Sequence, residues 1–226
     1  TVRPVDTIIA EAQDILSRWP LLMVYFQDDI FGYDRKWLEE FAGKWKTKVN
    51  VPFHCQIRLE LANHDAGNRR LDLFKKAGCT GITLAIESGN AFLRDQVLFR
   101  HMPEEVIEEG CRKILSRGMT LRTEQILAVP FSDVSTELMT LGLNNRINPM
   151  MAWTSVLAPY GGTEMGTIAS NLGFYGGNND DLTDTYFDRS VLRHVEGGHR
   201  DIEGIFNNLN LDPKSRALLE MRVGKN

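Results

Sequence analysis

Three common sequence features are scarce or missing in this chain, and each shortage excludes a class of protein. Only three cysteines, Cys55, Cys79 and Cys111, occur among 226 residues; their wide spacing argues against a disulfide framework and predicts buried, reduced thiols. No apolar run approaches the roughly 20 residues of a membrane span, and no signal-peptide pattern opens the chain, so we expect a cytoplasmic protein. The formal net charge is −4, and no basic stripe appears. This balance argues against nucleic acid as a partner.

Alternating apolar and amphipathic segments are the main feature that is present. Five short apolar runs end abruptly in polar or breaking residues, and they cover residues 21–26, 51–57, 81–87, 121–129 and 151–157. Helical periodicity lies between them, with an expected cap at Asp34 and expected helix ends at Gly78 and Gly118. Such alternation predicts parallel strands joined by right-handed crossover helices, either in an open doubly wound sheet or in a barrel.

The side chains of the predicted strands favour the barrel. Because neighbouring residues of a strand point to opposite faces, His54, Gln56 and Arg58 share one face, and Arg122 shares a face with Glu124. So many polar groups cannot be packed against helices without partners. We therefore expect an α/β fold of the TIM-like, partial (β/α)6 barrel type, with a polar central cavity.

The end of the third apolar run is the best candidate for a site. Residues 81–87 form a buried strand in this interpretation, and the run stops at Glu87, Ser88 and Gly89. Ligands of parallel α/β proteins collect at the carboxyl ends of strands, so Glu87 would stand at that rim. The alternative is that Ser88 or Asn90 only caps the next helix and Glu87 is solvated. The histidines show no spacing typical of a metal site.

Composition also suggests how the chain is divided. The glycine-rich and asparagine-rich run 176–181 is typical of a linker. It separates a predicted barrel portion, residues 1–175, from a helical C-terminal extension, residues 176–226. Short helices are expected in that extension at 186–195, 202–209 and 213–222.

Several short segments, in this order and spacing, carry a resemblance to a known family. They are FQDDIF at 26–31, PFHCQIR at 52–58, AGC at 77–79 with IESG at 86–89, VLFR at 97–100, RTEQIL at 122–127 and PYGGTE at 159–164. Together they resemble radical S-adenosylmethionine enzymes, especially the branch that often carries an upstream cobalamin-binding domain. The likeness covers residues of the predicted barrel portion.

The resemblance implies a fold, cofactors and partners. It implies a partial barrel that binds S-adenosylmethionine across its strand ends beside a 4Fe-4S cluster, with cobalamin as a further cofactor of that branch. Reductive cleavage of S-adenosylmethionine in such enzymes gives a 5′-deoxyadenosyl radical, or the molecule donates a methyl group. The partners implied are a small-molecule substrate of unknown identity and a reductant such as flavodoxin or ferredoxin.

Four cofactor-binding residues implied by the resemblance lie in the later strands. Glu87 and Ser88 match the contact after the fourth family strand, Arg100 the cation that faces the methionine carboxylate, and Glu124 the group near the ribose hydroxyls. An arginine can hold a carboxylate through two charge-assisted hydrogen bonds. The alternatives are that Arg100 is a helix-end cation and that Glu124 pairs with Arg122.

Four more implied contacts lie earlier in the chain. Asp28 and Asp29 match the loop that meets the methionine amino group, and Gln56 or Arg58 matches a contact of the third family strand. The alternative for Asp28 and Asp29 is an ordinary turn.

The sequence also departs from the family pattern. The CxxxCxxC loop whose thiolates bind the cluster is absent, and three scattered cysteines cannot replace it. We therefore expect no metal ligands in this chain and interpret it as a fragment without the first strand and the cluster loop, inactive alone. In addition, Ala128-Val129-Pro130-Phe131 stands where relatives usually have Gly-Leu-Pro-Gly, and Gly161 stands where proline is common. Ala128 and Phe131, which stand in place of glycine, disfavour the positive φ angles that glycine adopts readily.

Two other functions remain open. The barrel can be catalytically degenerate and serve as a nucleoside-binding or scaffold module. It can also be an unrelated barrel enzyme in which Glu87 and Glu124 act as general acid and base. The substrate and the reaction type are not fixed by any residue pattern.

Overall fold

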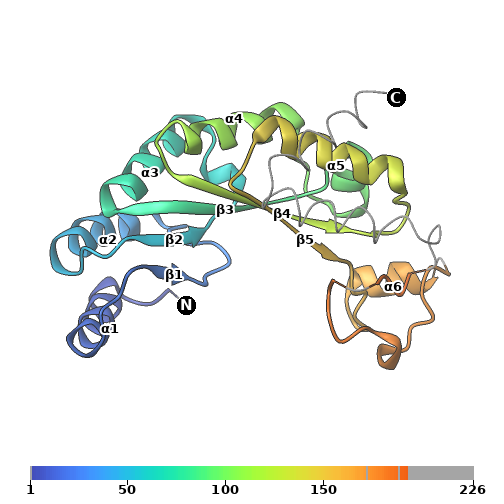
Figure 1. Cartoon of the computed structure of the whole chain (residues 1–226), viewed down its shortest axis with the longest axis horizontal. Coiled ribbons are helices and arrows are strands. Elements are labelled where there is room, and N and C mark those ends of the chain that lie inside the picture. The colour runs from blue at the N-terminus through green and yellow to red at the C-terminus, as the bar shows by residue number, and fades with distance from the viewer. Residues whose placement is uncertain (1, 172, 188, 193–226) are drawn as a thin grey trace. The chain divides into compact units, whose positions relative to one another are not determined.

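Two compact units make up the described part of the chain. The structure, a computed structural model, describes residues 2–171, 173–187 and 189–192 (Figure 1). The first unit comprises the described residues up to Ala85 together with Glu105–Arg122, and the second comprises Ile86–Glu104 together with the described residues from Thr123 onward. No helix in these ranges is long and apolar enough to cross a membrane.

Five parallel strands pair in the order in which they occur in the chain. They are β1 (Val24–Phe26), β2 (Phe53–Gln56), β3 (Cys79–Glu87), β4 (Thr120–Leu127) and β5 (Met151–Val156). Each overlaps one of the five predicted runs. A doubly wound sheet reverses its strand order, whereas a (β/α) barrel keeps it, so the partial TIM-like class is confirmed. Strand β1 lies at the edge of this order, and the preceding Leu22 and Met23 are exposed.

Helices separate the strands, as the alternation predicted. They are α1 (Val5–Arg18), α2 (Arg35–Lys48), α3 (His64–Ala77), α4 (Glu104–Leu115), α5 (Val134–Ile147) and α6 (Glu164–Asn171), with short helical turns η1 (Leu59–Leu61), η2 (Leu93–Val97) and η3 (Asn179–Asp181). Local chemistry sets the ends. Asp34 accepts a hydrogen bond from the Trp37 backbone N–H at 2.8 Å, and Gly78 ends α3 with a φ of +103°. Both signals were predicted.

Aromatic rings fill the core of the first unit. Phe26 of β1 and Phe53 of β2 pack edge-to-face with Phe41 and Trp45 of α2, at centroid distances between 5.2 and 5.9 Å. Trp45 is fully buried, and its indole N–H donates to the Val51 carbonyl at 2.8 Å. Such pairs add specific geometry to a large buried area, so α2 is fixed against β1 and β2.

The opposite face of the first unit's strands is polar, as the alternation predicted. His54 stacks on Tyr25 at 4.8 Å, and its Nε2 lies 2.7 Å from Thr83 Oγ1. Burial is the main reason why the pKa of His54 falls to about 4, and the charge of Arg122 lowers it further. At neutral pH this imidazole is therefore uncharged and serves as a hydrogen-bonding group.

The three cysteines have the packing role that was predicted. Cys55, Cys79 and Cys111 are free and buried. Burial raises the pKa of the Cys55 thiol far above its ordinary value and that of Cys111 to about 12. These thiols therefore stay protonated at physiological pH.

A buried polar network joins three elements of the second unit. Thr123 of β4 donates to Asn144 Oδ1 of α5 at 2.6 Å, Asn144 donates to Gln125 Oε1 at 3.0 Å, and Gln125 donates to the Trp153 carbonyl of β5 at 2.6 Å. Because α5 buries polar as well as apolar residues, its sequence lacks a clear apolar stripe, and its bounds were not predicted.

Most of the predicted C-terminal extension lies outside the described residues. This holds for the helices expected at 202–209 and 213–222 and for the end of the helix expected at 186–195. Residues 186–187 and 192 form bends, and residues 189–191 have no regular structure, so the helix expected at 186–195 is wrong over its described residues.

Two glycines of the first unit should respond oppositely to alanine. A Cβ on Gly81 would lie 2.4 Å from Thr120 Oγ1 and 2.5 Å from His54 Nδ1, whereas a Cβ on Gly43 of α2 meets no atom within 4 Å. We expect Gly81→Ala to lower the free energy of unfolding by about 1–3 kcal/mol through overpacking. Gly43→Ala should raise it by about 0.5–1 kcal/mol through helix propensity. Urea unfolding of both variants measures this, and a neutral Gly81→Ala would contradict the packing described for His54.

Candidate functional site

Strand β3 ends in an unusual backbone conformation at Glu87. This residue has a φ of +62°, in the left-handed region that non-glycine residues rarely adopt. The next two residues are held by α5: the Gly89 N–H donates to Thr140 Oγ1 at 2.8 Å, and a Cβ on Gly89 would lie 2.5 Å from the Met139 carbonyl oxygen. A glycine is therefore required at position 89. Its contacts with α5 fix the path of the backbone where it leaves β3.

Arg100 lies in a second strained segment of the same unit. It follows η2, a π-helical turn, and its backbone N–H donates to the Arg94 carbonyl at 2.9 Å. Its neighbours Phe99 and His101 have φ values of +52° and +46°. π-Helical turns and left-handed residues recur at functional sites, where surrounding contacts hold strained backbone in place.

The structure brings together three of the predicted site residues. The Arg100 Nε lies 3.6 Å from Glu87 Oε1, and the two side chains are 24% and 17% exposed. Burial raises the pKa of Glu87, the charge of Arg100 lowers it and the charge of Glu124 raises it. Two carboxylates and one guanidinium thus share a half-buried electrostatic environment. This set of charges can hold a ligand that carries a carboxylate, an ammonium group or hydroxyls.

Ser88, a fourth predicted residue, lies deeper in the protein. Its side chain is 1% exposed; its Oγ accepts a hydrogen bond from the Asn90 N–H at 3.1 Å and lies 3.4 Å from Thr140 Oγ1. Asn90 Oδ1 in turn accepts from the Leu93 N–H at 3.0 Å. The serine and the asparagine therefore shape the turn that leads from β3 into η2.

The turn after β4 is held by a buried glutamate of α5 that sequence reasoning missed. Glu137 of α5 is 1% exposed and accepts a hydrogen bond from the Ala128 N–H at 2.9 Å. Ala128 and Phe131 have φ values of +57° and +69°. They keep positive φ angles at the two positions where the family usually has glycine. No sequence signal marked Glu137, because a glutamate in the first turns of a helix is ordinary on a solvated surface.

Burial dominates the titration of this glutamate. It raises the pKa of Glu137 to about 7, although the hydrogen bond from the Ala128 N–H and the nearby Ser132 side chain favour the ionised form. The carboxyl group therefore titrates near neutral pH while it holds the turn between β4 and α5.

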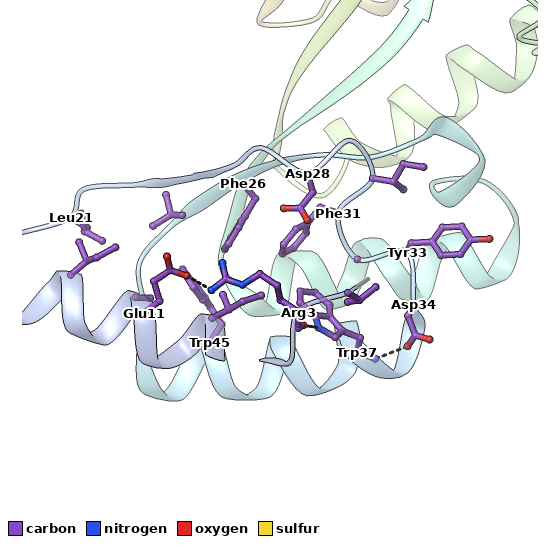
Figure 2. Close-up of a pocket in the computed structure, with 17 residues that line it drawn as sticks. Arg3, Glu11, Leu21, Phe26, Asp28, Phe31, Tyr33, Asp34, Trp37 and Trp45 are labelled. Atoms are coloured by element: carbon purple, nitrogen blue, oxygen red, sulfur yellow. Dashed lines mark hydrogen bonds and ion pairs between the residues drawn. The ribbon is translucent and has the colours of Figure 1, made fainter. Parts of the chain in front are cut away.

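The remaining predicted residues belong to the first unit. Asp28 lines a cavity of about 460 Å³ between α1 and the β1 segment. Figure 2 shows its carboxylate above the rings of Phe26 and Phe31, with the Arg3 and Glu11 ion pair on the same cavity. Aromatic and aliphatic side chains make up most of the wall, so the cavity favours an apolar occupant.

The other three predicted residues of the first unit are Asp29, which follows Asp28, Gln56, which is the last residue of β2, and Arg58, which lies two residues after it. Asp29 is exposed, Gln56 is half-buried, and its carbonyl accepts a hydrogen bond from the Phe31 N–H at 2.8 Å. Arg58 is 48% exposed and pairs with Glu60 at 2.6 Å. An exposed ion pair contributes little stability, so Arg58 is held in place only weakly.

The described residues do not fit a 4Fe-4S cluster. In the ranges 2–171, 173–187 and 189–192, no group of three or more His, Cys, Asp or Glu side chains is arranged to hold a metal ion. The three cysteines are buried with raised thiol pKa values for Cys55 and Cys111, whereas cluster ligands are thiolates. No chemical step through a cluster can be assigned to these residues.

Comparisons with known proteins give matches among solved structures. No protein-family model and no curated protein matches the sequence. The radical S-adenosylmethionine methyltransferase TsrM from Kitasatospora setae, with cobalamin and a 4Fe-4S cluster bound, matches with a TM-score of 0.61 and 15% identity over 75% of this chain and 34% of TsrM. Coproporphyrinogen III oxidase (HemN) from Escherichia coli, a radical SAM enzyme, matches with a TM-score of 0.56 and 13% identity over 97% of this chain and 46% of HemN.

A third match has the same character. The cobalamin-dependent S-adenosylmethionine radical enzyme OxsB has a TM-score of 0.56 and 14% identity over 98% of this chain and 32% of OxsB. The chain thus spans less than half the length of each of these proteins. At such identities the likeness establishes the fold, and this chain has the fold found in radical S-adenosylmethionine enzymes, including cobalamin-dependent ones. The resemblance seen in the sequence is confirmed at that level.

The strain beside Arg100 can be measured at His101, whose side chain is exposed. His101→Gly and His101→Ala both remove the imidazole, but only glycine adopts a positive φ without a steric penalty. We expect the glycine variant to be more stable than the alanine variant by about 1 kcal/mol in urea unfolding. Equal stability of the two variants would show that position 101 is not strained.

The buried glutamate gives the stability a specific pH dependence. Because the pKa of Glu137 is raised to about 7, the native state keeps a proton between pH 4.5 and 7 that the unfolded state has released. Stability contributed by this group therefore falls as the pH rises through that window. The control Glu137→Gln keeps the acceptor oxygen for the Ala128 N–H but does not titrate. Relative to this variant, the unfolding free energy of wild type should fall by on the order of 3 kcal/mol as the pH rises from 4.5 to 7.

Asp133 provides a control of opposite sign. Hydrogen bonds from Thr136 lower its pKa, so its stabilising contribution is lost as the pH falls. The difference between wild type and Asp133→Asn should therefore grow with rising pH. Parallel stability curves for wild type and Glu137→Gln would contradict the buried, protonated state of Glu137.

Proposed function

We propose that the second unit binds S-adenosylmethionine, with Arg100 facing the methionine carboxylate and Glu124 the ribose hydroxyls. The observation that supports this most is the half-buried group of Glu87, Arg100 and Glu124, held by strained backbone at the end of β3 and after η2. A guanidinium that lies 3.6 Å from a carboxylate can also form charge-assisted hydrogen bonds with a ligand carboxylate. The fold likeness to radical S-adenosylmethionine enzymes supports the choice of ligand.

Each residue has a task that its chemistry can perform. Arg100 supplies a fixed cation, and Glu87 keeps it oriented while no ligand is bound. Glu124 accepts hydrogen bonds from hydroxyl groups, and Ser88 shapes the turn that presents Glu87. Bound S-adenosylmethionine supplies a transferable methyl group or radical chemistry.

The activity of the whole protein is a wider proposal. We propose that these residues form part of a radical S-adenosylmethionine enzyme whose cluster ligands come from outside the described residues, with cobalamin as a further cofactor and flavodoxin or ferredoxin as reductant. The cavity beside the open edge of β1 offers room for an additional element there. The contacts predicted for Asp28, Asp29, Gln56 and Arg58 belong to the first unit and stay predictions.

A catalytically degenerate module that binds a nucleoside is the second candidate. The observation that favours it is that Cys55 and Cys111, buried thiols with raised pKa values, do not fit a cluster. Such a module would recognise the adenosine portion of a ligand and make no use of the methionine portion. The two candidates therefore differ in how much Arg100 contributes to binding.

Calorimetric titration of this chain with two ligands tests the proposal. S-adenosylmethionine carries the amino acid portion, and 5′-methylthioadenosine lacks it. We expect Arg100→Lys to weaken S-adenosylmethionine binding about tenfold or more, because lysine cannot form the paired hydrogen bonds of a guanidinium. Binding of 5′-methylthioadenosine should stay the same.

Arg146→Lys is the matched control. Arg146 also belongs to the second unit and pairs with Glu104 on the surface, so its exchange should change neither affinity. Equal affinity of wild type and Arg100→Lys for S-adenosylmethionine would remove Arg100 from the site. Equal affinity of wild type for both ligands would favour the nucleoside-binding module.

A further inference from the structure

Arg94 is a cation inside the second unit that the proposed binding group does not include. The residue lies in η2 and is 1% exposed. Its Nη1 donates to the Ser88 carbonyl at 3.0 Å, and its Nε lies 3.6 Å from Asp95 Oδ1. Burial of a guanidinium is unfavourable, and an apolar side chain of similar size would fill the space without that penalty. The presence of a buried arginine at this position is therefore best explained by what its polar contacts hold in place.

These contacts connect the two strained segments. Ser88 directly follows the left-handed Glu87, and the Arg94 carbonyl accepts the backbone N–H of Arg100 at 2.9 Å. The side chain of one residue thus holds the segment of Glu87, and its backbone holds the segment of Arg100.

Asp95 extends the same arrangement past Arg100. Its Oδ1 accepts a hydrogen bond from the Met102 N–H at 3.3 Å and also faces the Arg94 guanidinium. The left-handed His101 therefore lies between two anchored amides, that of Arg100 on the Arg94 carbonyl and that of Met102 on the Asp95 carboxylate, and the left-handed Phe99 directly precedes the first. Strained backbone persists only where such contacts overdetermine it.

We propose that Arg94 is a positioning residue, which fixes the Glu87 carboxylate and the Arg100 guanidinium at a mutual geometry suited to a ligand with a carboxylate group. The nature of the ligand rests on the function proposed above, and the positioning itself does not. Arg94 acts through the backbone: its guanidinium holds the Ser88 carbonyl, and its own carbonyl holds the Arg100 N–H. Removal of its side chain should uncouple Glu87 from Arg100 although both residues remain.

A double-mutant cycle tests the positioning without any ligand. The cycle combines Glu87→Gln and Arg100→Gln, and urea unfolding gives the coupling between the two residues as a ratio of unfolding constants. In the wild-type background we expect a coupling of about tenfold, as for contacting charges. In the Arg94→Met background it should fall below about twofold. Arg94→Lys keeps one donor and should retain part of the coupling.

Thr140→Val serves as the matched control. It removes other buried contacts of the same turn, the hydrogen bond from the Gly89 N–H and the contact with Ser88 Oγ, and it leaves the Ser88 carbonyl, Arg94 and Arg100 connected. The coupling of about tenfold should persist in this background. If Arg94→Met leaves the coupling unchanged, or if Thr140→Val abolishes it equally, the positioning role is wrong. Should Arg94→Met not fold, the Glu87–Arg100 coupling is compared between the Arg94→Lys and Thr140→Val backgrounds. The positioning role then requires a lower coupling in Arg94→Lys than in Thr140→Val.

Ligand titration separates this inference from the proposed function. Arg94→Lys should weaken S-adenosylmethionine binding about tenfold and leave binding of 5′-methylthioadenosine unchanged, while Thr140→Val changes the two affinities equally. If wild type does not bind S-adenosylmethionine but the cycle behaves as expected, the proposed function fails and the positioning role stands. If binding occurs and Arg94→Lys weakens both ligands equally, Arg94 does not position the pair.

Discussion

The left-handed conformation of Glu87 is the constraint on which the second unit depends. A strand that continued through this residue would take the backbone along another path, and Gly89 would lose its contacts with α5. The conformation persists because contacts hold it from several sides: Gly89 fits against α5, Asn90 Oδ1 accepts the N–H of Leu93 at the start of η2, and Arg94 holds the Ser88 carbonyl. The contact of Gly89 joins distant parts of the sequence and the other two lie within the turn, and together they select one path for the chain.

The same unit obtains glycine-like backbone without glycine. Ala128 and Phe131 adopt left-handed angles after β4, where the buried carboxyl of Glu137 accepts the Ala128 N–H. A hydrogen bond inside the protein thus compensates for the side chains that oppose this geometry. Backbone shape and sequence motif are therefore separable here, and the loss of a glycine pattern does not imply loss of the turn.

Sequence patterns predicted the elements well and the buried polar groups poorly. All five strands and the ends marked by Asp34 and Gly78 follow from periodicity and capping, because these signals are local. The approach of Glu87, Arg100 and Glu124 was expected from a resemblance, since their separation in the sequence hides it. Glu137 and Arg94 had no signal, because burial of a charged side chain depends on distant neighbours. The α5 helix was obscured for the same reason, since Asn144 is buried as deeply as its apolar residues.

The edge strand β1 has a consequence for the behaviour of the molecule in solution. It is short, its outer side pairs with no strand in the described ranges, and it follows Leu22, which is 90% exposed, and Met23, which is 54% exposed. Open peptide groups beside apolar side chains offer a template onto which another chain can add. Concentrated solutions of this polypeptide should therefore tend toward filament-like or amorphous association through β1, and a charged residue at position 22 would act as a gatekeeper against it.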